Sequence, residues 1–596
     1  MAGQKEPQLA SESAGTEDAQ PTDDAPADDE ADAEAEGEDD GDDDDQPQPA
    51  GAEAEGGADD TAKAKKKRKP KKKKKKAADA TAGASTSIST ELQAPSNSGA
   101  PQKPPVGHDM ASLLQQLALS PPGKSKGKAP EDYKFWNTQP VPKFREPNLL
   151  QTTSGANGEA LPEGPILPDA VCKASVKPEP EKLVDGFEWC VVDLEDKDEL
   201  KELYELLYGH YVEDVDGSFR FNYSTQFLAW ALKPPGWRKD WHIGVRTKPN
   251  ADGKRKLVAF IAGIPVTLQV RDATIKASEI NFLTIHRKLR AKRLAPVLIK
   301  EVTRRCYENG VYQALYTAGT LLPTPISTCR YYHRSLDWEH LYKVGFAHLP
   351  PHSSELRQKL RYKLESSTST KGLRPMGRGD VGQVRVLLER YLKRFHLRQE
   401  FDEEDIEHWF CSEASKGVVW AYVVEGDGGK ITDFMSYYLL EVSTPFPSLP
   451  FPFQHSSLLI FNQRDEVDTN ASNTKQSTVL RNSRNEEIRA AYLYYYATDA
   501  AFKRKSTEST QSILRARLEA LMHDMLILAK RDNFHVFNAV SLLDNPLFLT
   551  ENKFLPGDGS LHYYLFNWRT GLVPGGINEA NALDASKTGG VGVVML

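Results

Sequence analysis

Cysteine is scarce in this chain of 596 residues. The five cysteines are scattered, and no two of them form a C-x-x-C pair: Cys172, Cys190, Cys306, Cys329 and Cys411. An odd number without pairing argues against a disulfide framework or a cysteine-based zinc site, and favours reduced thiols in the cytosol. We expect each cysteine to be a small core residue and not a nucleophile.

Long hydrophobic runs are also missing. No apolar stretch approaches the roughly 20 residues that span a bilayer, and the acidic N-terminus lacks the apolar core of a signal peptide. We therefore expect a soluble, cytoplasmic protein. An obvious Ser-His-Asp or Cys-His arrangement is absent as well, so the sequence offers no familiar covalent nucleophile.

Residues 1–130 have little that could form a core. Up to Asp60 they are mostly Asp, Glu, Ala, Gly and Pro, and the charge then changes sign in the tract KAKKKRKPKKKKKK, from Lys63 to Lys76. Such a segment cannot bury enough apolar surface to offset the entropy of ordering. We expect it to be disordered, first acidic and then Lys-rich.

The lysine tract has two interpretations. Its positive charge suits docking to a polyanion, either ribosomal RNA or acidic membrane lipid. The alternative is a solvated solubility tail or a localisation signal.

The most informative stretch is 279–310, which begins as a strand and ends as a helix. Apolar residues mark the strand up to Ile285, and a helix is expected from Pro296, which suits a first helical position. Five cations lie in between: Arg287, Lys288, Arg290, Lys292 and Arg293. A helix N-terminus with these cations favours a site for a ligand with two or three phosphates. A basic solvated turn or a nuclear-import patch is the alternative.

Strand and helix patterns alternate on both sides of this stretch, which predicts an α/β fold with a mixed sheet and helices. Residues 257–265 and 266–270 are expected as paired strands before the central strand. A similar order follows later, with helices at 376–394 and 402–410, strands at 418–425, 431–442 and 490–498, a long helix at 512–531 and a strand at 534–540. The polar stretch 463–489 is interpreted mainly as an inserted surface loop without a role.

Three motifs carry a resemblance to a known family. The sequence EINFLTIHRKLRAKRLAP at 279–296 resembles the signature of the N-myristoyltransferases, and KFLPGDG at 553–559 is similar to their second signature. YKFWNTQPV at 133–141 resembles the segment that opens their catalytic region. The motifs stand in the family's order and approximate spacing. The resemblance covers residues 132–596 and is strongest to the fungal type.

The resemblance implies a fold of two acetyltransferase-like (GNAT) halves related by pseudo-two-fold symmetry. Residues 131–345 would form the acyl-CoA-binding half, and residues 346–596 the peptide-binding half that ends in a catalytic C-terminus. The implied reaction is co-translational transfer of myristate from myristoyl-CoA to the N-terminal glycine of proteins. No metal and no permanently bound cofactor are expected. The expected state is a monomer, and the lysine tract would mediate ribosome association.

Acylation of a glycine amine needs a base, because an α-amino group has a pKa of about 8. The resemblance implies that the C-terminal carboxylate of Leu596 is this base, and the apolar tail GGVGVVML could carry it inward, where burial raises basicity. From the residues alone, a last strand without a role is the alternative. The resemblance also implies an oxyanion hole of the Phe282 and Leu283 backbone N–H groups, with Asn281 and Thr317 holding the amine.

The remaining site residues also come from the resemblance. Acyl-CoA contacts are expected from Tyr133, Lys134, Phe135, Trp136, Leu283, Thr284, Ile285, Ala291, Lys292, Arg293, Leu294 and Ala295. The peptide is expected to contact Tyr211, Asp214, Asp216, Phe219, Phe221, Tyr316, Tyr331, His333 and Asp558, and the acidic pair would attract basic residues of substrates. A calcium loop is the alternative for the acidic segment, but the EF-hand glycine and glutamate are missing. His333 is equally well a satisfied structural histidine.

Several positions depart from the family pattern. Thr284 stands where cysteine is usual, and Ala291 where serine is frequent. Arg293 replaces a glycine of the wider acetyltransferase group, and Leu555-Pro556 alters the second signature. The alternative functions are another acyl-CoA N-acyltransferase or a ribosome- or RNA-binding protein that acts through the lysine tract. Dependence of acyl transfer on an N-terminal glycine separates them.

Overall fold

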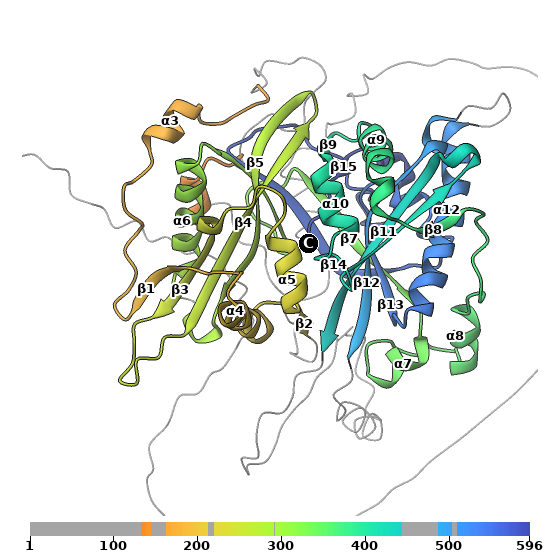
Figure 1. Ribbon diagram of the computed structural model, residues 1–596, viewed down its shortest axis with the longest axis horizontal. Helices are drawn as coiled ribbons and strands as arrows, with labels where there is room; N and C mark the ends of the chain where they lie inside the picture. The colour runs from red at the N-terminus through yellow and green to blue at the C-terminus, as the bar shows by residue number, and fades with distance from the viewer. Residues whose placement is uncertain (1–132, 145–161, 213–219, 291, 444–486, 504–508) are drawn as a thin grey trace, which may run out of the picture. The chain divides into compact units, whose positions relative to one another are not determined.

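The structure is a computed structural model that describes residues 133–144, 162–212, 220–290, 292–443, 487–503 and 509–596, all within one compact unit (Figure 1). Several sequence predictions lie outside these residues and receive no structural account. They are the region before residue 131 with its lysine tract, Asp214, Asp216, Phe219, Ala291, and most of the 463–489 insertion.

Fifteen strands form one mixed sheet in the described part of the chain. They are β1 (Phe187–Val191), β2 (Arg220–Asn222), β3 (His242–Thr247), β4 (Leu257–Val270), β5 (Ala273–Ile285), β6 (Gln313–Ala318), β7 (Ser327–Ser335), β8 (Leu373–Pro375), β9 (Leu397–Gln399), β10 (Val419–Glu425), β11 (Ile431–Ser443), β12 (Ile488–Thr498), β13 (Val536–Val540), β14 (Leu555–Phe566) and β15 (Val591–Gly592). The main path runs β1-β3-β4-β5-β6-β14-β7-β13-β12-β11-β10-β8.

Helices cover this sheet on both faces. They are α2 (Lys134–Thr138), α3 (Asp169–Ala174), α4 (Lys197–His210), α5 (Thr225–Leu232), α6 (Leu294–Glu308), α7 (Trp338–Lys343), α8 (Glu355–Arg361), α9 (Val381–Leu392), α10 (Glu403–Cys411) and α12 (Thr510–Arg531). Short 3-10 turns include η2 (Lys239–Trp241), η3 (Arg287–Leu289), η4 (Arg378–Asp380), η5 (Asp427–Gly429), η7 (Asp499–Phe502), η8 (Asn545–Leu547) and η9 (Ala585–Lys587).

The main path has the same arrangement of strands whether it is followed from β1 or from β8 towards the centre. This confirms the prediction of two acetyltransferase-like halves. In the first half β4 and β5 are antiparallel, and β5 continues through α6 into the parallel strand β6. In the second half β11 and β12 are antiparallel, and β12 continues through α12 into the parallel strand β13. Each antiparallel pair contains a bulge. The right-handed connection of parallel strands through a helix accounts for this recurring unit.

The two central strands exchange partners between the halves. β14, from the end of the chain, pairs with β6 of the first half, while β7 pairs with β13 of the second half. β14 and β7 also pair with each other, so one sheet continues through the centre (Figure 1). A division of the chain near residue 345 remains a prediction, and it would cut through a continuous sheet.

The prediction of two paired strands in 257–270 is wrong, because these residues form the single strand β4. The strand runs through Pro265 and Val266 without a turn, and β5 pairs with it antiparallel from Ala259 to Val270. The other edge of β4 pairs with β3 as far as Ala262 and with β9 from Leu268 onwards. Pro265 lies in the unpaired gap between these two partners and is therefore tolerated. No ladder hydrogen bond from Pro265 is therefore needed at this position.

β4 and β5 carry apolar side chains on both faces and are covered on both. Phe260, Ala262 and Ile264 pack into the main core with α4 and α5, whereas Val258 and Ile261 pack with Leu298 and Val302 of α6. The fully covered strand explains why 257–266 reads as a nearly continuous apolar run.

All five cysteines are free thiols, either buried or partly buried. Burial raises the pKa of Cys306 and of Cys329 to about 12, which keeps these thiols protonated and inert. The structure thus confirms the prediction of reduced structural cysteines. Among the helices that the structure describes, none is long and apolar enough to cross a membrane.

Candidate active site

The central strand β5 is bulged at Phe282. The pairing register passes from Phe260↔Thr284 to Ala262↔Asn281, so Phe282 and Leu283 together oppose one residue of β4. Phe282 has a φ of 58°, which is uncommon for a residue with a side chain. Its ring is buried between the rings of Tyr211 and Tyr223, at centroid distances of 5.7 and 5.3 Å. Tertiary packing holds this backbone out of the regular ladder.

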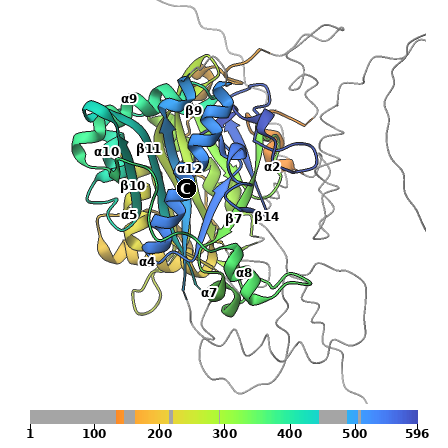
Figure 2. The ribbon, with the colours of Figure 1, turned by 90° about the vertical axis from the view of Figure 1, so that its right-hand side faces the viewer.

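The C-terminal tail is buried. Val591, Val593, Val594 and Met595 are each at most 8% exposed, and Leu596 is partly buried against the main core. The tail is held by β15, which pairs with β9, and by two tyrosines. In both views the end of the chain lies among the strands and not at the margin of the fold (Figures 1 and 2).

Two buried tyrosines fix the backbone of the tail just before its end. The Val594 N–H donates to the Tyr495 hydroxyl at 3.0 Å, and the Tyr563 hydroxyl donates to the Val593 carbonyl at 3.0 Å. Tyr495 lies on β12 and Tyr563 on β14, so two strands of the sheet hold the tail through hydrogen bonds. Burial of the backbone polar groups without these partners would be costly.

The residues expected around the amine lie on neighbouring strands. In β14 Tyr563 pairs with Thr317 of β6, and the parallel pairing of β5 with β6 ends at Glu279 and Leu315, two residues before Asn281 and Thr317. The Asn281 side chain is 9% exposed and donates to the Glu279 carboxylate at 2.8 Å. β5, β6 and β14 are thus adjacent in the sheet, and Tyr563 of β14 binds the tail.

Aromatic side chains extend from this point towards β2. Tyr223 contacts Phe221 and Phe282, and Phe221 contacts Tyr492, with ring centroids 5.3 to 6.5 Å apart. Burial raises the pKa of Tyr331 to about 12, with a further contribution from nearby Tyr211. Of the residues predicted to contact a peptide, Tyr211, Phe221 and Tyr331 therefore lie in one region.

The second signature packs directly on two of the predicted peptide residues. A Cβ at Gly557 would lie 2.3 Å from His333 Nε2, and a Cβ at Gly559 would lie 3.2 Å from the Tyr331 ring. His333 Nδ1 is 2.7 Å from Asn538 Oδ1, and burial lowers its pKa although nearby Asp558 opposes the shift. The glycines are thus required by close approach.

The altered dipeptide of the second signature lies in β14. Leu555 pairs with His333 and Pro556 with Tyr332, and the pairing is displaced only between Pro556 and Ser560. The departure from the family pattern therefore leaves the strand intact.

The helix after the basic turn begins at Leu294, two residues earlier than expected from Pro296. Pro296 is then the third helical residue, whose N–H would also lack a partner within the helix. Arg293 precedes the helix with a φ of 55°, and no side chain caps the N-terminus. Arg293 thus adopts a left-handed backbone, which costs a residue with a side chain roughly 1–2 kcal/mol.

Positive charge accumulates next to this helix N-terminus. The pKa of His210 is lowered to about 4 by burial and by the neighbouring His286, Arg287 and Arg290, and that of Arg287 is lowered by burial and by Arg290. The two imidazole rings lie 3.9 Å apart. Arg290 donates to the His210 carbonyl at 2.8 Å. The cations of the turn and the uncapped N-terminus of α6 together form an electropositive site that would favour a bound anion.

The opening segment forms a separate aromatic cluster. Tyr133, Phe135 and Trp136 are buried with residues of α6 and β14, whereas Lys134 is exposed. Trp136 stacks on Tyr316 at 5.6 Å, and Tyr316 stacks on Tyr564 at 5.0 Å. Tyr316, which the resemblance implies as a peptide contact, packs in this cluster, and its role stays a prediction.

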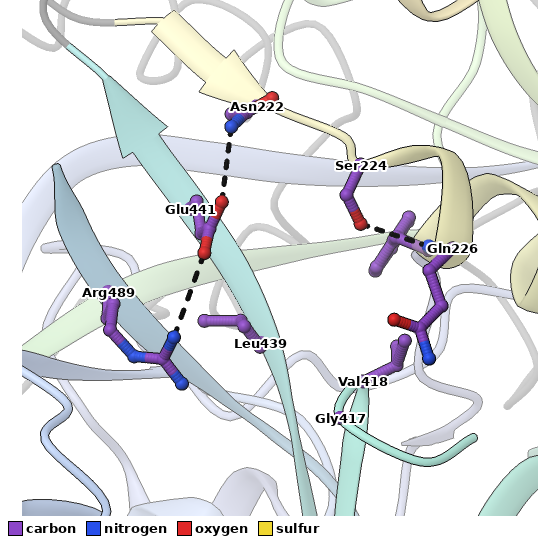
Figure 3. Close-up of a pocket in the computed structure, with 9 residues that line it drawn as sticks. Asn222, Ser224, Gln226, Gly417, Val418, Leu439, Glu441 and Arg489 are labelled. Atoms are coloured by element: carbon purple, nitrogen blue, oxygen red, sulfur yellow. Dashed lines mark hydrogen bonds and ion pairs between the residues drawn. The ribbon is translucent and has the colours of Figure 1, made fainter. Parts of the chain in front are cut away.

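A cavity of about 250 Å³ lies elsewhere, between β2, α5 and β10 to β12 (Figure 3). Glu441 accepts from Asn222 Nδ2 at 3.1 Å and lies 3.8 Å from Arg489. None of the sequence-predicted site residues lines it. Within the described ranges no cluster of His, Cys, Asp and Glu has the arrangement of a metal site.

Sequence reasoning missed three residues that contact Asn281 or the tail: Glu279, Tyr495 and Tyr563. Glu279 begins the first signature, and a glutamate at the predicted start of a strand is normally solvated, but in the structure it lies in the middle of β5. Tyr495 belongs to the run YLYYY at 492–496, whose alternation alone could have shown that Tyr495 and Tyr496 face opposite sides. No feature of the sequence around Tyr563 indicated a role in the site.

Comparison with known proteins connects this geometry with one family. The family model for the N-terminal domain of myristoyl-CoA:protein N-myristoyltransferase matches residues 167–329, and that for the C-terminal domain matches 343–445 and 464–594. The glycylpeptide N-tetradecanoyltransferase of Aspergillus fumigatus is 49% identical over 492 residues, which cover 82% of this chain and 88% of the relative. That of Schizosaccharomyces pombe is 45% identical, over 81% and 95%.

Solved structures agree with these relatives. The Saccharomyces cerevisiae N-myristoyltransferase with bound myristoyl-CoA matches with a TM-score of 0.66 and 42% identity, over 78% of this chain and 100% of that chain. Two family models in sequence order, close relatives and the shared fold lead to one conclusion. The chain is a member of the myristoyl-CoA:protein N-myristoyltransferase family.

Proposed function

We propose that this protein transfers the myristoyl group of myristoyl-CoA to the α-amino group of an N-terminal glycine. The observation that carries the proposal is the buried C-terminal tail, which two tyrosines hold beside the β5 bulge. A bulged strand with a fixed backbone provides preorganised N–H donors, and the carboxylate of the partly buried Leu596 provides a base. The curated relatives named above share this activity by name.

The proposed reaction needs no covalent enzyme intermediate. The Leu596 carboxylate removes a proton from the glycine ammonium, while Asn281 and Thr317 hold the amine. The amine nitrogen attacks the thioester carbonyl, and the backbone N–H groups of Phe282 and Leu283 stabilise the oxyanion. The C–S bond then breaks and an amide forms. The nitrogen gives up its second proton, the departing CoA thiolate takes up that proton, and the Leu596 carboxyl group releases the first proton to solvent.

The CoA phosphates occupy the electropositive turn at the N-terminus of α6. Lys292 and Arg293 are exposed there, so both can reach an anion. Tyr133, Phe135 and Trp136 shape the acyl-CoA side through their buried cluster. The peptide follows Tyr211, Phe221, Tyr331 and His333, with Asp558 beside His333.

The first test is release of CoA from myristoyl-CoA in the presence of an octapeptide that begins with glycine or of its twin that begins with alanine. The full chain is compared with a form that lacks Met595 and Leu596. We expect turnover only with the glycine peptide, and in the truncated form we expect turnover to collapse while myristoyl-CoA binding is retained.

The outcomes separate the parts of the proposal. Absence of turnover with either peptide contradicts the enzymatic function and leaves the RNA-binding alternative. Full activity of the truncated form keeps the enzyme but rules out Leu596 as the base.

We also propose that the lysine tract from Lys63 to Lys76 associates the enzyme with ribosomes in the cytoplasm. A block of like charge binds phosphate backbones by releasing counterions, so co-sedimentation with ribosomes should fall steeply with salt. Deletion of residues 63–76 should abolish co-sedimentation and leave peptide acylation unchanged. Co-sedimentation that survives the deletion contradicts the proposal.

A further inference from the structure

The proposed mechanism leaves one buried carboxylate without a role. Glu279 is 4% exposed and lies on β5 two residues before Asn281, so both side chains project from the same face of the strand. Its Oε1 accepts from Asn281 Nδ2 at 2.8 Å. Within the part of the chain that the structure describes, no cation forms an ion pair with it. A buried carboxyl group without a cation is costly and calls for a reason.

The donors and acceptors of Glu279 and Asn281 determine the orientation of the Asn281 side-chain amide. An asparagine side chain offers a donor on Nδ2 and an acceptor on Oδ1, whereas an ionised carboxylate only accepts. Glu279 therefore selects the orientation in which Nδ2 faces it. The reverse orientation would oppose two acceptor oxygens. Asn281 Oδ1 is consequently directed away from Glu279 and stays available as an acceptor.

The substrate requires this orientation. A glycine ammonium or amine bears N–H groups, so the side chain that holds it must present an acceptor. An Asn281 amide turned the other way would present its NH₂ group to the ammonium and repel it.

Glu279 also lies next to the groups that hold the C-terminal tail. The pKa values of Tyr494, Tyr495 and Tyr563 are raised by burial and, in part, by the charge of Glu279. Two of these tyrosines bind the tail at Val593 and Val594. The carboxylate thus stands where the amine-holding strand meets the tail.

We propose that Glu279 is a positioning residue for acyl transfer, whose carboxylate holds Asn281 with Oδ1 towards the amine of the incoming N-terminal glycine. This inference rests on the function proposed above. Glu279 touches neither the amine nor the thioester, and it acts through Asn281.

The test is Glu279→Gln, which keeps size and shape but lets either end of the new amide face Asn281. At about pH 8, where Glu279 is ionised, we expect kcat for the glycine peptide to fall roughly tenfold, because one oriented hydrogen bond to the amine is lost. The KM for the peptide and the Kd for myristoyl-CoA should change less than about twofold, since binding groups outside the amine are untouched.

A double-mutant cycle shows whether Glu279 acts through Asn281. Asn281→Ala removes the amide, so the double variant E279Q/N281A should have the kcat of N281A alone. Independent, multiplicative losses would overturn the proposal, as would a wild-type kcat in E279Q. If E279Q lacks a cooperative thermal transition, Glu279→Asp, which retains a carboxylate, takes its place in the same cycle.

Asp524→Asn is the matched control for loss of a buried carboxylate. Asp524 is fully buried on α12 and accepts from the Ser369 and Thr370 N–H groups, outside the site. It should lower thermal stability and leave kcat unchanged, and a kcat loss equal to that of E279Q would contradict the proposal. An inactive wild-type enzyme would instead refute the proposed function.

Discussion

At the scale of single residues, two neighbouring tyrosines of β12 allow an effect on stability to be distinguished from an effect on catalysis. Tyr495 and Tyr496 are both fully buried and face opposite sides of the strand. The Tyr495 hydroxyl accepts from the Val594 N–H, and the Tyr496 hydroxyl accepts from the Asp544 N–H, each at 3.0 Å. Only Tyr495 touches the C-terminal tail. Removing either hydroxyl therefore breaks a comparable hydrogen bond to a backbone N–H, at the tail for Tyr495 and away from it for Tyr496.

We expect Tyr495→Phe and Tyr496→Phe to lower the free energy of unfolding by a similar amount, roughly 1–3 kcal/mol, because each leaves a buried N–H unpaired. Only Tyr495→Phe should reduce kcat, since only the tail carries the proposed base. Denaturant unfolding and steady-state acylation measure both quantities. Equal kcat values in the two variants would show that the hold on the tail is irrelevant to the chemistry.

Glu279 also makes a prediction about pH. Burial raises its pKa from 4.5 to about 7, although the Asn281 hydrogen bond lowers it. The folded state therefore binds more protons than the unfolded state between these values, and stability falls as pH rises through this window. The neighbouring Tyr494, Tyr495 and Tyr563 have raised pKa values and stay neutral throughout.

Glu279→Gln removes this dependence. The free energy of unfolding of E279Q minus that of the wild type should rise between about pH 5 and about pH 8, by at most roughly 3 kcal/mol. Denaturant titrations at several pH values test it. A difference that stays constant over this range would mean that the pKa of Glu279 is not raised.

At the scale of elements, the turn from η3 to α6 combines two sources of positive potential. The helix N-terminus has no side-chain cap, and burial, together with His286 and the cations of the turn, lowers the pKa of His210 to about 4. Helix dipole and charged side chains both favour an anion at this end.

We expect Lys292→Ala to weaken binding of myristoyl-CoA roughly tenfold, because a charge-assisted contact to phosphate is lost. Lys276→Ala is the control, since Lys276 is an exposed lysine of β5 outside the turn. Calorimetric titration at two salt concentrations should show a weaker salt dependence only for the Lys292 variant. Equal affinities in both variants would remove Lys292 from the phosphate site.

At the scale of the whole molecule, the exchange of central strands ties the halves together. β14 lies between β6 and β7, and β7 pairs with β13, so neither half contains all of its own sheet. The tail then returns to pair with β9. The proposed site uses both halves, because Asn281 and Thr317 come from one half and Tyr495 and the tail from the other.

Residues 131–345 and 346–596 expressed separately should therefore not fold. Each piece would expose a strand edge that the other covers in the full chain. We expect neither piece alone to show a cooperative thermal transition, whereas residues 131–596 should show one. A cooperative transition in either isolated piece would establish it as an independent domain.

Much of the fold was predictable because it is local. The strand, basic turn and helix at 279–310, the hairpin around η5 and the helix α12 follow from side-chain periodicity and turn residues. The division of 257–270 into two strands failed because Pro265 suggested a break. In the structure, the edge of β4 that faces β3 and β9 is unpaired at Pro265. The periodicity of side chains does not show which strand edges are paired.

The sequence by itself determined the family, the alternation of strands and helices and the apolar character of the tail, since these depend on neighbouring residues. Only the tertiary structure decided that Glu279 and Tyr563 stand beside the tail, that Phe282 adopts a positive φ, and that Tyr316 stacks on Trp136. These features depend on strands paired across hundreds of residues. The pairing is set by the packing of the whole sheet, which no local pattern encodes.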